Sequence, residues 1–224
     1  MQKNEITFRS PRIREPLDLL VLSDSHGRRI RGALKLAEER FPDAVLFAGD
    51  VMNRHRRKST GREAEPLEEM AAICPTFFVA GNHDAYGADG PAEALRQAGV
   101  RVLENGEENF RGIRIGGVPS VQFAPEREGE TVAFVRQFCR EDGAFRLLLC
   151  HHPEYYDRYF GGMPFDLMIS GHAHGGQIRL FGRGLFAPGQ GVLPKYTSGL
   201  YHERLLVSRG MANHVLVPRL FNPT

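Results

Sequence analysis

Two histidines separated by a single residue are the first groups in this sequence that could do chemistry. His172 and His174 lie in the run SGHAHGGQ at residues 170–177, directly after an apolar segment at residues 166–169. Neutral imidazole is a common ligand for transition metals, and the neighbouring glycines allow sharp turns beside the rings. A packed or solvated histidine pair is the alternative, so the interpretation depends on whether other ligands converge on the pair.

Four further polar clusters follow apolar runs along the chain, and none of them contains cysteine. Oxygen and nitrogen donors without thiolate favour Mn, Fe, Zn or Co over a structural zinc site. The donors exceed the needs of one ion, and two ions that share a carboxylate, ~3.5–4 Å apart, are a standard arrangement for displacement at phosphorus. Besides the two histidines above, the candidate groups are Asp24, His26, Asp50, Asn82, His83, Asp84 and His151.

The first hundred residues alternate between apolar runs of strand length and segments with helical spacing. This alternation indicates a parallel sheet, and in such sheets ligands bind at the carboxyl ends of the strands. The polar clusters at Asp24, Asp50 and Asn82 each follow one of these apolar runs and should therefore converge. The predicted strands are 17–22, 44–48 and 76–80, and the predicted helices are 30–41, 67–73 and 91–98.

The second half of the sequence predicts shorter strands, and we expect a second, mixed sheet packed against the first. Residues 175–199 are rich in glycine and lack periodicity, which is typical of a long functional or mobile loop. No linker separates the two halves, so residues 1–224 are predicted to form a single domain. The predicted strands are 100–103, 107–110, 112–118, 145–150, 166–169, 202–208 and 214–220, with a helix at 131–140.

The composition bounds the class of protein. Of 224 residues, 42% are hydrophobic and 25% are charged, as in ordinary globular proteins, and the formal net charge of +2 argues against a stable nucleic-acid partner. No apolar run is long enough to cross a bilayer, and residues 1–16 lack an apolar signal core, so no transmembrane anchor is expected. Cys74, Cys139 and Cys150 have no metal-ligand spacing and are expected to be free thiols in a reducing cytoplasm.

Taken together and in order, the clusters resemble the signature of the calcineurin-like metallophosphoesterases. The blocks that carry the resemblance are Asp24-x-His26, Gly49-Asp50, the run GNHD at 81–84, a solitary strand-end His151 and the run GHxH at 171–174. The extension GGQ at 175–177, with the segments at 198–201 and 207–210, resembles a bacterial, phosphodiesterase-like branch of that family.

The resemblance implies an α/β fold, namely a four-layer α-β-β-α sandwich of two mixed sheets with the metal site at the strand ends. It implies hydrolysis of a phosphoester in a small-molecule or nucleotide-type substrate, through attack by a hydroxide that bridges two divalent transition-metal ions. His83 would serve as the acid at the leaving-group oxygen, and Asp84 would orient its ring. The implied metal ligands are Asp24, His26 and His174 for one ion, Asn82, His151 and His172 for the other, and Asp50 as the bridge between them.

The sequence leaves several assignments open. His151 and His152 compete for one ligand position, and His151 is favoured because it comes first after the strand. Asp24 has a simpler role as a helix cap, and Asn82 has one as a turn residue. The basic residues 54–58 either hold a substrate phosphate or form a solvated loop, and His55, His202 and His214 match no motif.

Three functions remain as alternatives at this level. A phosphodiesterase is favoured over a phosphomonoesterase, because the long segment 175–199 suggests room for a second ester substituent. A metal-dependent nuclease uses the same chemistry but usually carries more basic and aromatic surface than this chain has. A non-catalytic, protein-binding scaffold on the same fold would not need the complete set of ligand residues.

Overall fold

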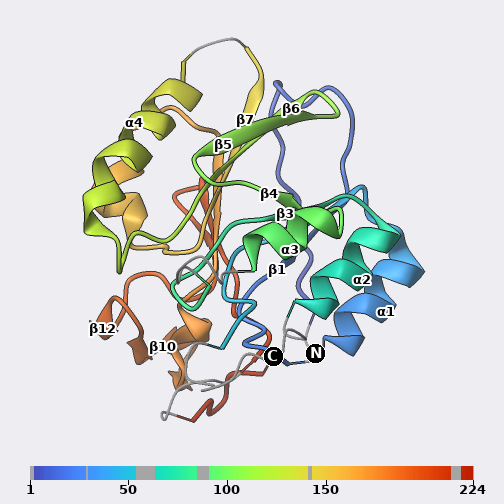
Figure 1. The fold of residues 1–224 in the computed structure, drawn as a ribbon. Coiled ribbons are helices and arrows are strands. Elements are labelled where there is room, and N and C mark those ends of the chain that lie inside the picture. The colour runs from blue at the N-terminus through green and yellow to red at the C-terminus, as the bar shows by residue number, and fades with distance from the viewer. Residues whose placement is uncertain are drawn as a thin grey trace.

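Two stacked β-sheets lie between layers of helices in the computed structural model (Figure 1), which describes residues 3–28, 30–53, 64–84, 91–140, 143–212 and 218–223. The α-helices are α1 (Arg31–Arg40), α2 (Glu65–Ile73), α3 (Ala92–Gln97) and α4 (Glu128–Phe138), and the shorter helical turns are η1 (Pro125–Arg127), η2 (Tyr156–Phe160) and η3 (His174–Gly176). The strands are β1 (Leu19–Leu22), β2 (Ala44–Phe47), β3 (Thr76–Phe78), β4 (Arg101–Val102), β5 (Gly106–Phe110), β6 (Ile113–Val118), β7 (Phe145–Cys150), β8 (Leu167–Ser170), β9 (Arg179–Leu180), β10 (Arg183–Gly184), β11 (Phe186–Ala187), β12 (Gly191–Val192), β13 (Gly199–Tyr201) and β14 (Leu205–Val207).

The first sheet has the strand order β1-β2-β3-β4, and all of its pairings are parallel. Successive side chains of a strand point to opposite faces, and both faces of β2 are apolar and buried. Val45 and Phe47 pack with the buried face of α1, α2 and α3, whereas Ala44 and Leu46 pack toward the second sheet. Burial on both faces is the reason that these strands are continuous apolar runs.

The second sheet is mixed and has the order β13-β14-β8-β7-β6-β5. Its central strands β6, β7, β8 and β14 are parallel, and only the edge strands β5 and β13 pair antiparallel with their neighbours. In β7, Leu147 and Leu149 face the first sheet, while Leu148 and Cys150 pack outward in a cluster with residues of α4 and η2.

Three apolar clusters therefore separate four layers of secondary structure. One lies between the first sheet and its helices, one between the two sheets, and one between the second sheet and the layer of α4 and η2. The α/β sandwich predicted from the sequence is confirmed. The first sheet differs from the expected pair of mixed sheets, because each of its strands returns through a crossover on the same face and all described pairings are parallel.

The glycine-rich segment after residue 175 is more ordered than the sequence predicts. It forms η3 and two short antiparallel hairpins, β9–β10 and β11–β12. Each strand has two residues, which is too short to produce a detectable period in the sequence. The first hairpin turns at Phe181 and Gly182, both with positive φ, as a two-residue hairpin turn requires.

The other departures from the predicted elements lie near the C-terminus. Residues 213–217 fall outside the described part of the chain, so the strand predicted at 214–220 is described only at its end, where Leu220 forms a single bridge with Ile178. Within the predicted strand 202–208, the structure forms β14, while β13 begins at Gly199, the last residue of the predicted loop, and ends before residue 202.

The three cysteines are free thiols, as predicted. Cys150 is fully buried at the end of β7, and its burial raises the pKa of the thiol far above the usual value. A buried protonated thiol is a packing group and not a nucleophile. None of the described helices combines the length and apolar character that a bilayer-crossing helix requires.

Candidate metal centre

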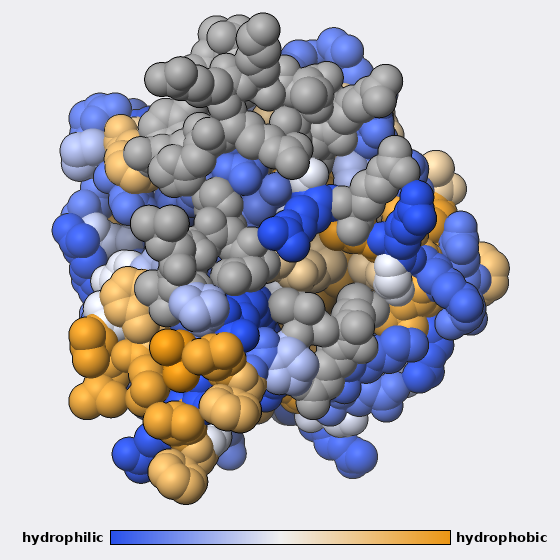
Figure 2. All heavy atoms as spheres, turned by 90° about the horizontal axis from the view of Figure 1, so that it is seen from below, coloured by the Kyte–Doolittle hydropathy of each residue, from blue (hydrophilic) through white to orange (hydrophobic). Residues whose placement is uncertain are grey.

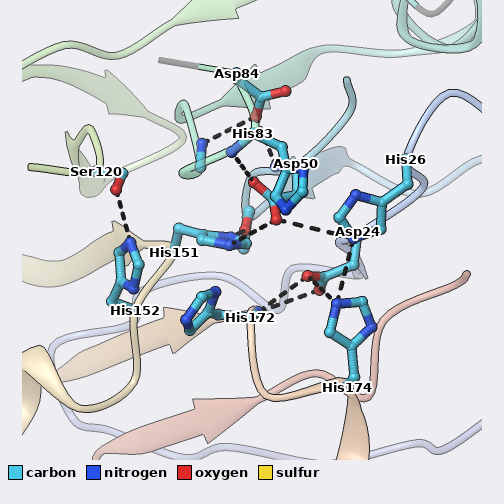
Figure 3. A network of polar contacts seen from close by, with 12 residues as sticks. Asp24, His26, Asp50, His83, Asp84, Ser120, His151, His152, His172 and His174 are labelled. Atoms are coloured by element: carbon cyan, nitrogen blue, oxygen red, sulfur yellow. Dashed lines mark hydrogen bonds and ion pairs between the residues drawn. The ribbon is translucent and has the colours of Figure 1, made fainter. Parts of the chain in front are cut away.

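The predicted ligand residues follow five parallel strands and meet at one edge of the sandwich (Figure 3). Strands β1, β2 and β3 of the first sheet and β7 and β8 of the second end at this edge, so residues far apart in the sequence lie together. Asp24 and His26 follow β1, Asp50 follows β2, Asn82, His83 and Asp84 follow β3, His151 follows β7, and His172 and His174 follow β8.

One group of ligand atoms comes from Asp24, His26 and His174, all of which are buried. His174 Nε2 lies 3.5 Å from Asp24 Oδ1 and 3.2 Å from His26 Nε2. The Nδ1 atom of His174 lies 3.2 Å from the carbonyl oxygen of Ala212, a hydrogen bond that leaves Nε2 as the atom facing the group. Two imidazole nitrogens and a carboxylate oxygen therefore point at one position.

A second group comes from Asp50, His151 and His172. His151 Nε2 lies 3.2 Å from Asp50 Oδ2, and His151 Nδ1 donates a 2.7 Å hydrogen bond to the carbonyl oxygen of Ala48. The same Asp50 oxygen lies 3.8 Å from His26 Nε2, which belongs to the first group. Asp50 is thus a carboxylate that lies between the two groups and contacts a histidine of each.

Two buried atoms at this edge, Asn82 Oδ1 and His172 Nε2, have no hydrogen-bond partner among the residues that the structure describes. Buried polar atoms normally have a partner, and leaving one without costs ~1–3 kcal/mol. Both atoms belong to the expected ligand set of the second ion. The donor set, made of imidazole, carboxylate and amide, fits divalent transition-metal ions.

The charges around Asp50 favour a buried positive charge. Burial raises the pKa of Asp50, but the imidazoles of His151 and His26 outweigh burial and hold that pKa well below the usual range. Burial lowers the pKa of His151, but the carboxylate of Asp50 outweighs it and raises that pKa to about 10. In both cases a cation beside the carboxylate is the stabilising element, and a metal ion supplies the same charge.

The backbone is strained at five ligand positions. Asp24, His26, Asp50, His172 and His174 all have positive φ, between 47° and 64°. Such conformations cost ~1–3 kcal/mol for residues other than glycine, and they persist where the surrounding structure enforces them, frequently at functional sites. The strain lets each strand end turn its side chain toward the shared edge.

Glycines next to the ligands are required because the backbones approach closely. At Gly49, which has a φ of 85°, a Cβ atom would lie 2.6 Å from His151 Nδ1. At Gly81, a Cβ atom would overlap the Asp50 carboxylate. The Gly-Asp and Gly-Asn pairs of the sequence motif thus have a steric cause.

The carboxylate of Asp84 is held by backbone groups of two loops, a role that the sequence did not indicate. Its carboxylate accepts hydrogen bonds from the backbone N–H groups of Asp50 (2.6 Å), Met52 (2.7 Å) and Gly81 (2.9 Å). Burial and the charge of Asp50 raise the pKa of Asp84 to about 7, against the opposing effect of the backbone donors. Asp84 joins the loops that follow β2 and β3, and so fixes the position of Asp50.

His83 lies at the rim of the two ligand groups and is partly exposed. Its backbone N–H donates a 2.8 Å hydrogen bond to Asp50 Oδ1, and its ring stands edge-on to the ring of His26 at a centroid distance of 4.7 Å. One of its ring nitrogens lies within 4.8 Å of ligand atoms of His26 and Asp50. The ring is therefore within reach of a group bound between the two ligand sets.

His152 points away from Asp50 and toward Ser120 (Figure 3). His152 Nε2 lies 2.7 Å from Ser120 Oγ, and Nδ1 lies 3.1 Å from Glu154 Oε1. Burial holds the pKa of His152 well below its usual value, so the ring is neutral. Of the two adjacent histidines, His151 is the one that the structure brings to the ligand group.

Glu154 is a residue of this site that the sequence analysis missed. Its Oε1 atom lies 3.8 Å from His172 Nε2, and its Oε2 atom is buried without a hydrogen-bond partner among the described residues. Gly189, at the tip of the β11–β12 hairpin, packs so closely that a Cβ atom there would overlap Glu154. The only signal in the sequence was an acidic residue three positions after His151.

The basic residues 54–58, which include His55, and His214 lie outside the described part of the chain. The contacts of His202 are with residues outside the ligand groups. Its ring stacks on Tyr156 at a centroid distance of 5.6 Å, and it hydrogen-bonds with the hydroxyl of Tyr196.

Comparisons with known proteins identify the family of this chain. Residues 17–176 match the family model of the calcineurin-like phosphoesterases. Phosphodiesterase YaeI of Escherichia coli (strain K12) is 31% identical over 180 residues, which cover 74% of this chain and 63% of that protein. A transmembrane protein with a metallophosphoesterase domain from Danio rerio is 30% identical over 181 residues, which cover 72% of this chain and 41% of that protein.

The matched regions thus span less than two thirds of the length of these two relatives. Among solved structures, NAD nucleotidase (NadN) of Haemophilus influenzae overlaps 70% of this chain and 38% of that chain, at a TM-score of 0.49 and 17% identity. The family model alone covers more than half of the chain and includes every predicted ligand residue. The chain belongs to the calcineurin-like phosphoesterase family.

Proposed function

We propose that this protein is a dinuclear metal-dependent phosphoesterase, and that it prefers phosphodiesters. The observation that carries the proposal is the position of Asp50, whose Oδ2 atom lies 3.2 Å from His151 Nε2 and 3.8 Å from His26 Nε2. Asp50 thereby connects two buried ligand groups, each of which offers three donor atoms within 4.8 Å of one another.

Each ligand group would hold one ion of Mn, Fe, Zn or Co. When bound, such a pair of ions neutralises charge on the phosphoryl oxygens and lowers the pKa of water to near 7. The residues proposed to hold the ions are Asp24, His26 and His174 on one side, Asn82, His151 and His172 on the other, and Asp50 on both.

The remaining residues of the site would position the ligands or act on the substrate. His83 at the rim would donate a proton to the departing ester oxygen. Asp84 would hold the loops of Asp50 and Asn82 in register through its three backbone hydrogen bonds. Glu154, whose Oε1 atom lies 3.1 Å from His152 Nδ1 and 3.8 Å from His172 Nε2, would place a further carboxylate beside the ion that His172 holds.

The proposal predicts two tightly bound transition-metal ions per chain. The protein is purified without chelator, supplied with Mn²⁺ and freed of excess metal, and its metal content is then measured by elemental analysis. The expected result is a stoichiometry that approaches two, together with hydrolysis that is lost on chelation and restored by metal. A reproducible maximum of one ion, or of none, would refute the dinuclear centre.

The preference for diesters predicts that bis(p-nitrophenyl) phosphate is cleaved faster than p-nitrophenyl phosphate. The proposal rests on the relative named as a phosphodiesterase. We expect a difference in kcat/KM of at least about tenfold, or ~1.4 kcal/mol in transition-state stabilisation. A clear preference for the monoester would make the protein a phosphomonoesterase with the same metal centre.

A further inference from the structure

Large apolar side chains are exposed together on the two hairpins that follow the metal-ligand turn η3. Phe181 is fully exposed, Val192 and Leu193 are 77% and 73% exposed, and Phe221 is 80% exposed. In Figure 2, which views the molecule from below, apolar side chains gather on the side where Figure 1 has β10 and β12. We call this set the hairpin surface, and it consists of Leu180, Phe181, Val192, Leu193, Leu220 and Phe221.

The six side chains belong to one continuous part of the molecule. Leu180, Phe181 and Phe221 line the same shallow hollow, and Leu220 pairs with Ile178 beside it. The N–H of Leu193 donates to the carbonyl of Leu185, whose own N–H donates to Ile178. Single exposed apolar residues are ordinary in soluble proteins, whereas a continuous exposed set marks an interaction surface.

Hydrogen bonds fix the hairpin surface relative to the metal centre. The N–H of Leu185 donates to the carbonyl of Gly176 over 3.1 Å, and Arg179 Nη1 donates to the carbonyl of Gly175 over 2.7 Å. Both acceptors belong to η3, which begins with the ligand His174. Gly189, in the turn between β11 and β12, packs against Glu154 beside His172. Anything that binds the hairpin surface is therefore held next to the metal centre.

The charge of this part of the chain is strongly positive, although the whole chain is close to neutral. After Asp166 the sequence contains one acidic residue, Glu203, and six basic residues. Two of the basic residues, Arg179 and Arg183, flank the exposed turn at Phe181. Arg183 is exposed at this turn, whereas Arg179 donates to the carbonyl groups of Gly175 and Gly182, and Lys195 pairs with Asp157. An exposed cation beside protruding apolar side chains is complementary to an anionic lipid headgroup layer over an apolar interior.

We propose that the hairpin surface docks the protein onto the surface of an anionic lipid bilayer. The apolar side chains enter the boundary between headgroups and acyl chains, and Arg183 contacts a lipid phosphate. A bilayer fits better than a protein groove, because the apolar groups project from narrow hairpin turns and the segment that forms the hairpins, between Asp166 and Glu203, contains no acidic residue. Docking places the metal centre at the membrane surface, and it does not depend on which ester is hydrolysed.

Co-sedimentation of the Mn-loaded protein with lipid vesicles tests the proposal. The protein is mixed with vesicles of phosphatidylcholine alone and with vesicles that also contain phosphatidylglycerol. We expect sedimentation with the anionic vesicles, weakened by salt, and much less with phosphatidylcholine alone. The absence of binding to anionic vesicles, or equal binding to both kinds, would overturn the proposal.

Substitutions in the hairpin surface test whether these residues make the contact with the vesicles. Replacing Phe181 and Phe221 together with serine should weaken partitioning at least about tenfold, because two large apolar groups are removed. Arg183→Gln should weaken it about fivefold, which corresponds to the loss of one cation at an anionic surface. Phe41→Ser is the matched control, since Phe41 is 75% exposed at the C-terminal end of α1 and should change nothing.

Circular dichroism and thermal unfolding establish that each variant is folded. Light scattering in the absence of vesicles detects the competing possibility of self-association. If the wild type is a dimer that ignores vesicles and the Phe181/Phe221 double variant is a monomer, the surface is a dimer interface and the proposal is wrong. Because the readout is binding and not hydrolysis, a catalytically inactive protein that still binds anionic vesicles would support docking while refuting the proposed function.

Discussion

Replacement of Asp50 with asparagine is expected to abolish metal binding and hydrolysis together. The substitution keeps the shape of the side chain but removes the negative charge and one acceptor oxygen from the point between the two ligand groups. Asp50 Oδ2 lies 3.2 Å from His151 Nε2 and 3.8 Å from His26 Nε2, and no other carboxylate spans the two groups in the described residues. We expect kcat/KM to fall by at least about 10³-fold, or ~4 kcal/mol.

Thermal unfolding gives a readout for Asp50→Asn that does not depend on activity. A ligand at one hundred times its Kd stabilises the folded state by about 2.7 kcal/mol, which raises the Tm of a domain of this size by about 5–10 °C. The wild type should show this rise when Mn²⁺ is added, and Asp50→Asn should not.

Asp43→Asn is the matched control for this experiment. Asp43 lies at the other end of β2, where it pairs with Arg111 and accepts a hydrogen bond from the backbone of Asp18. The same change of charge at that end should leave metal binding and hydrolysis intact. Retention of two ions and of most of the activity in Asp50→Asn would show that this carboxylate does not bridge the centre.

Replacement of His83 with alanine is expected to preserve metal binding and to slow hydrolysis. The backbone N–H of residue 83 holds Asp50 Oδ1, and alanine retains that group, so the bridging carboxylate should keep its position. What is lost is the imidazole at the rim of the site. A general acid typically contributes ~10²–10⁴-fold to the rate, and the loss should reach this range for esters whose leaving group is a strongly basic alkoxide.

The dependence on leaving group distinguishes the possible roles of His83. An alkoxide needs a proton as it departs, whereas p-nitrophenolate leaves well without one, so the defect should shrink along a series of increasingly acidic leaving groups. The series is measured on the wild type, on His83→Ala and on His202→Ala, a control histidine that contacts Tyr156 and Tyr196. Loss of metal from His83→Ala would make His83 a ligand. A uniform defect across the series would place its action on the phosphoryl group and contradict the role of acid.

The sequence by itself determined the α/β fold and the edge of the sheets at which the site lies. Polar clusters after Leu22, Phe47 and Phe78 could be read as convergent because parallel strands bring their carboxyl ends to one edge. The residue types then indicated metal-dependent chemistry, since carboxylate, amide and imidazole donors without thiolate favour divalent transition-metal ions. These inferences need only local pattern and the general topology of the fold.

The partners of Asp84 and the position of Glu154 were decided by the tertiary structure. Asp84 was expected to orient the ring of His83, and the close approach of the loops after β2 and β3 gives its carboxylate three backbone donors that the sequence did not indicate. Glu154 had no motif of its own and enters the site only because the chain after β7 turns back toward His172. Such contacts depend on the spacing between loops, which no sequence period encodes.

The hairpins after His174 are a second feature that could not be predicted from the sequence. Their two-residue strands are too short to produce a period, so glycine content alone indicated a loop. Only the three-dimensional fold gathers Phe181, Val192 and Phe221 on one exposed surface beside the metal centre. Strand ends follow from topology, whereas the exposure of a side chain depends on every segment that packs around it, and that packing is a property of the whole folded chain.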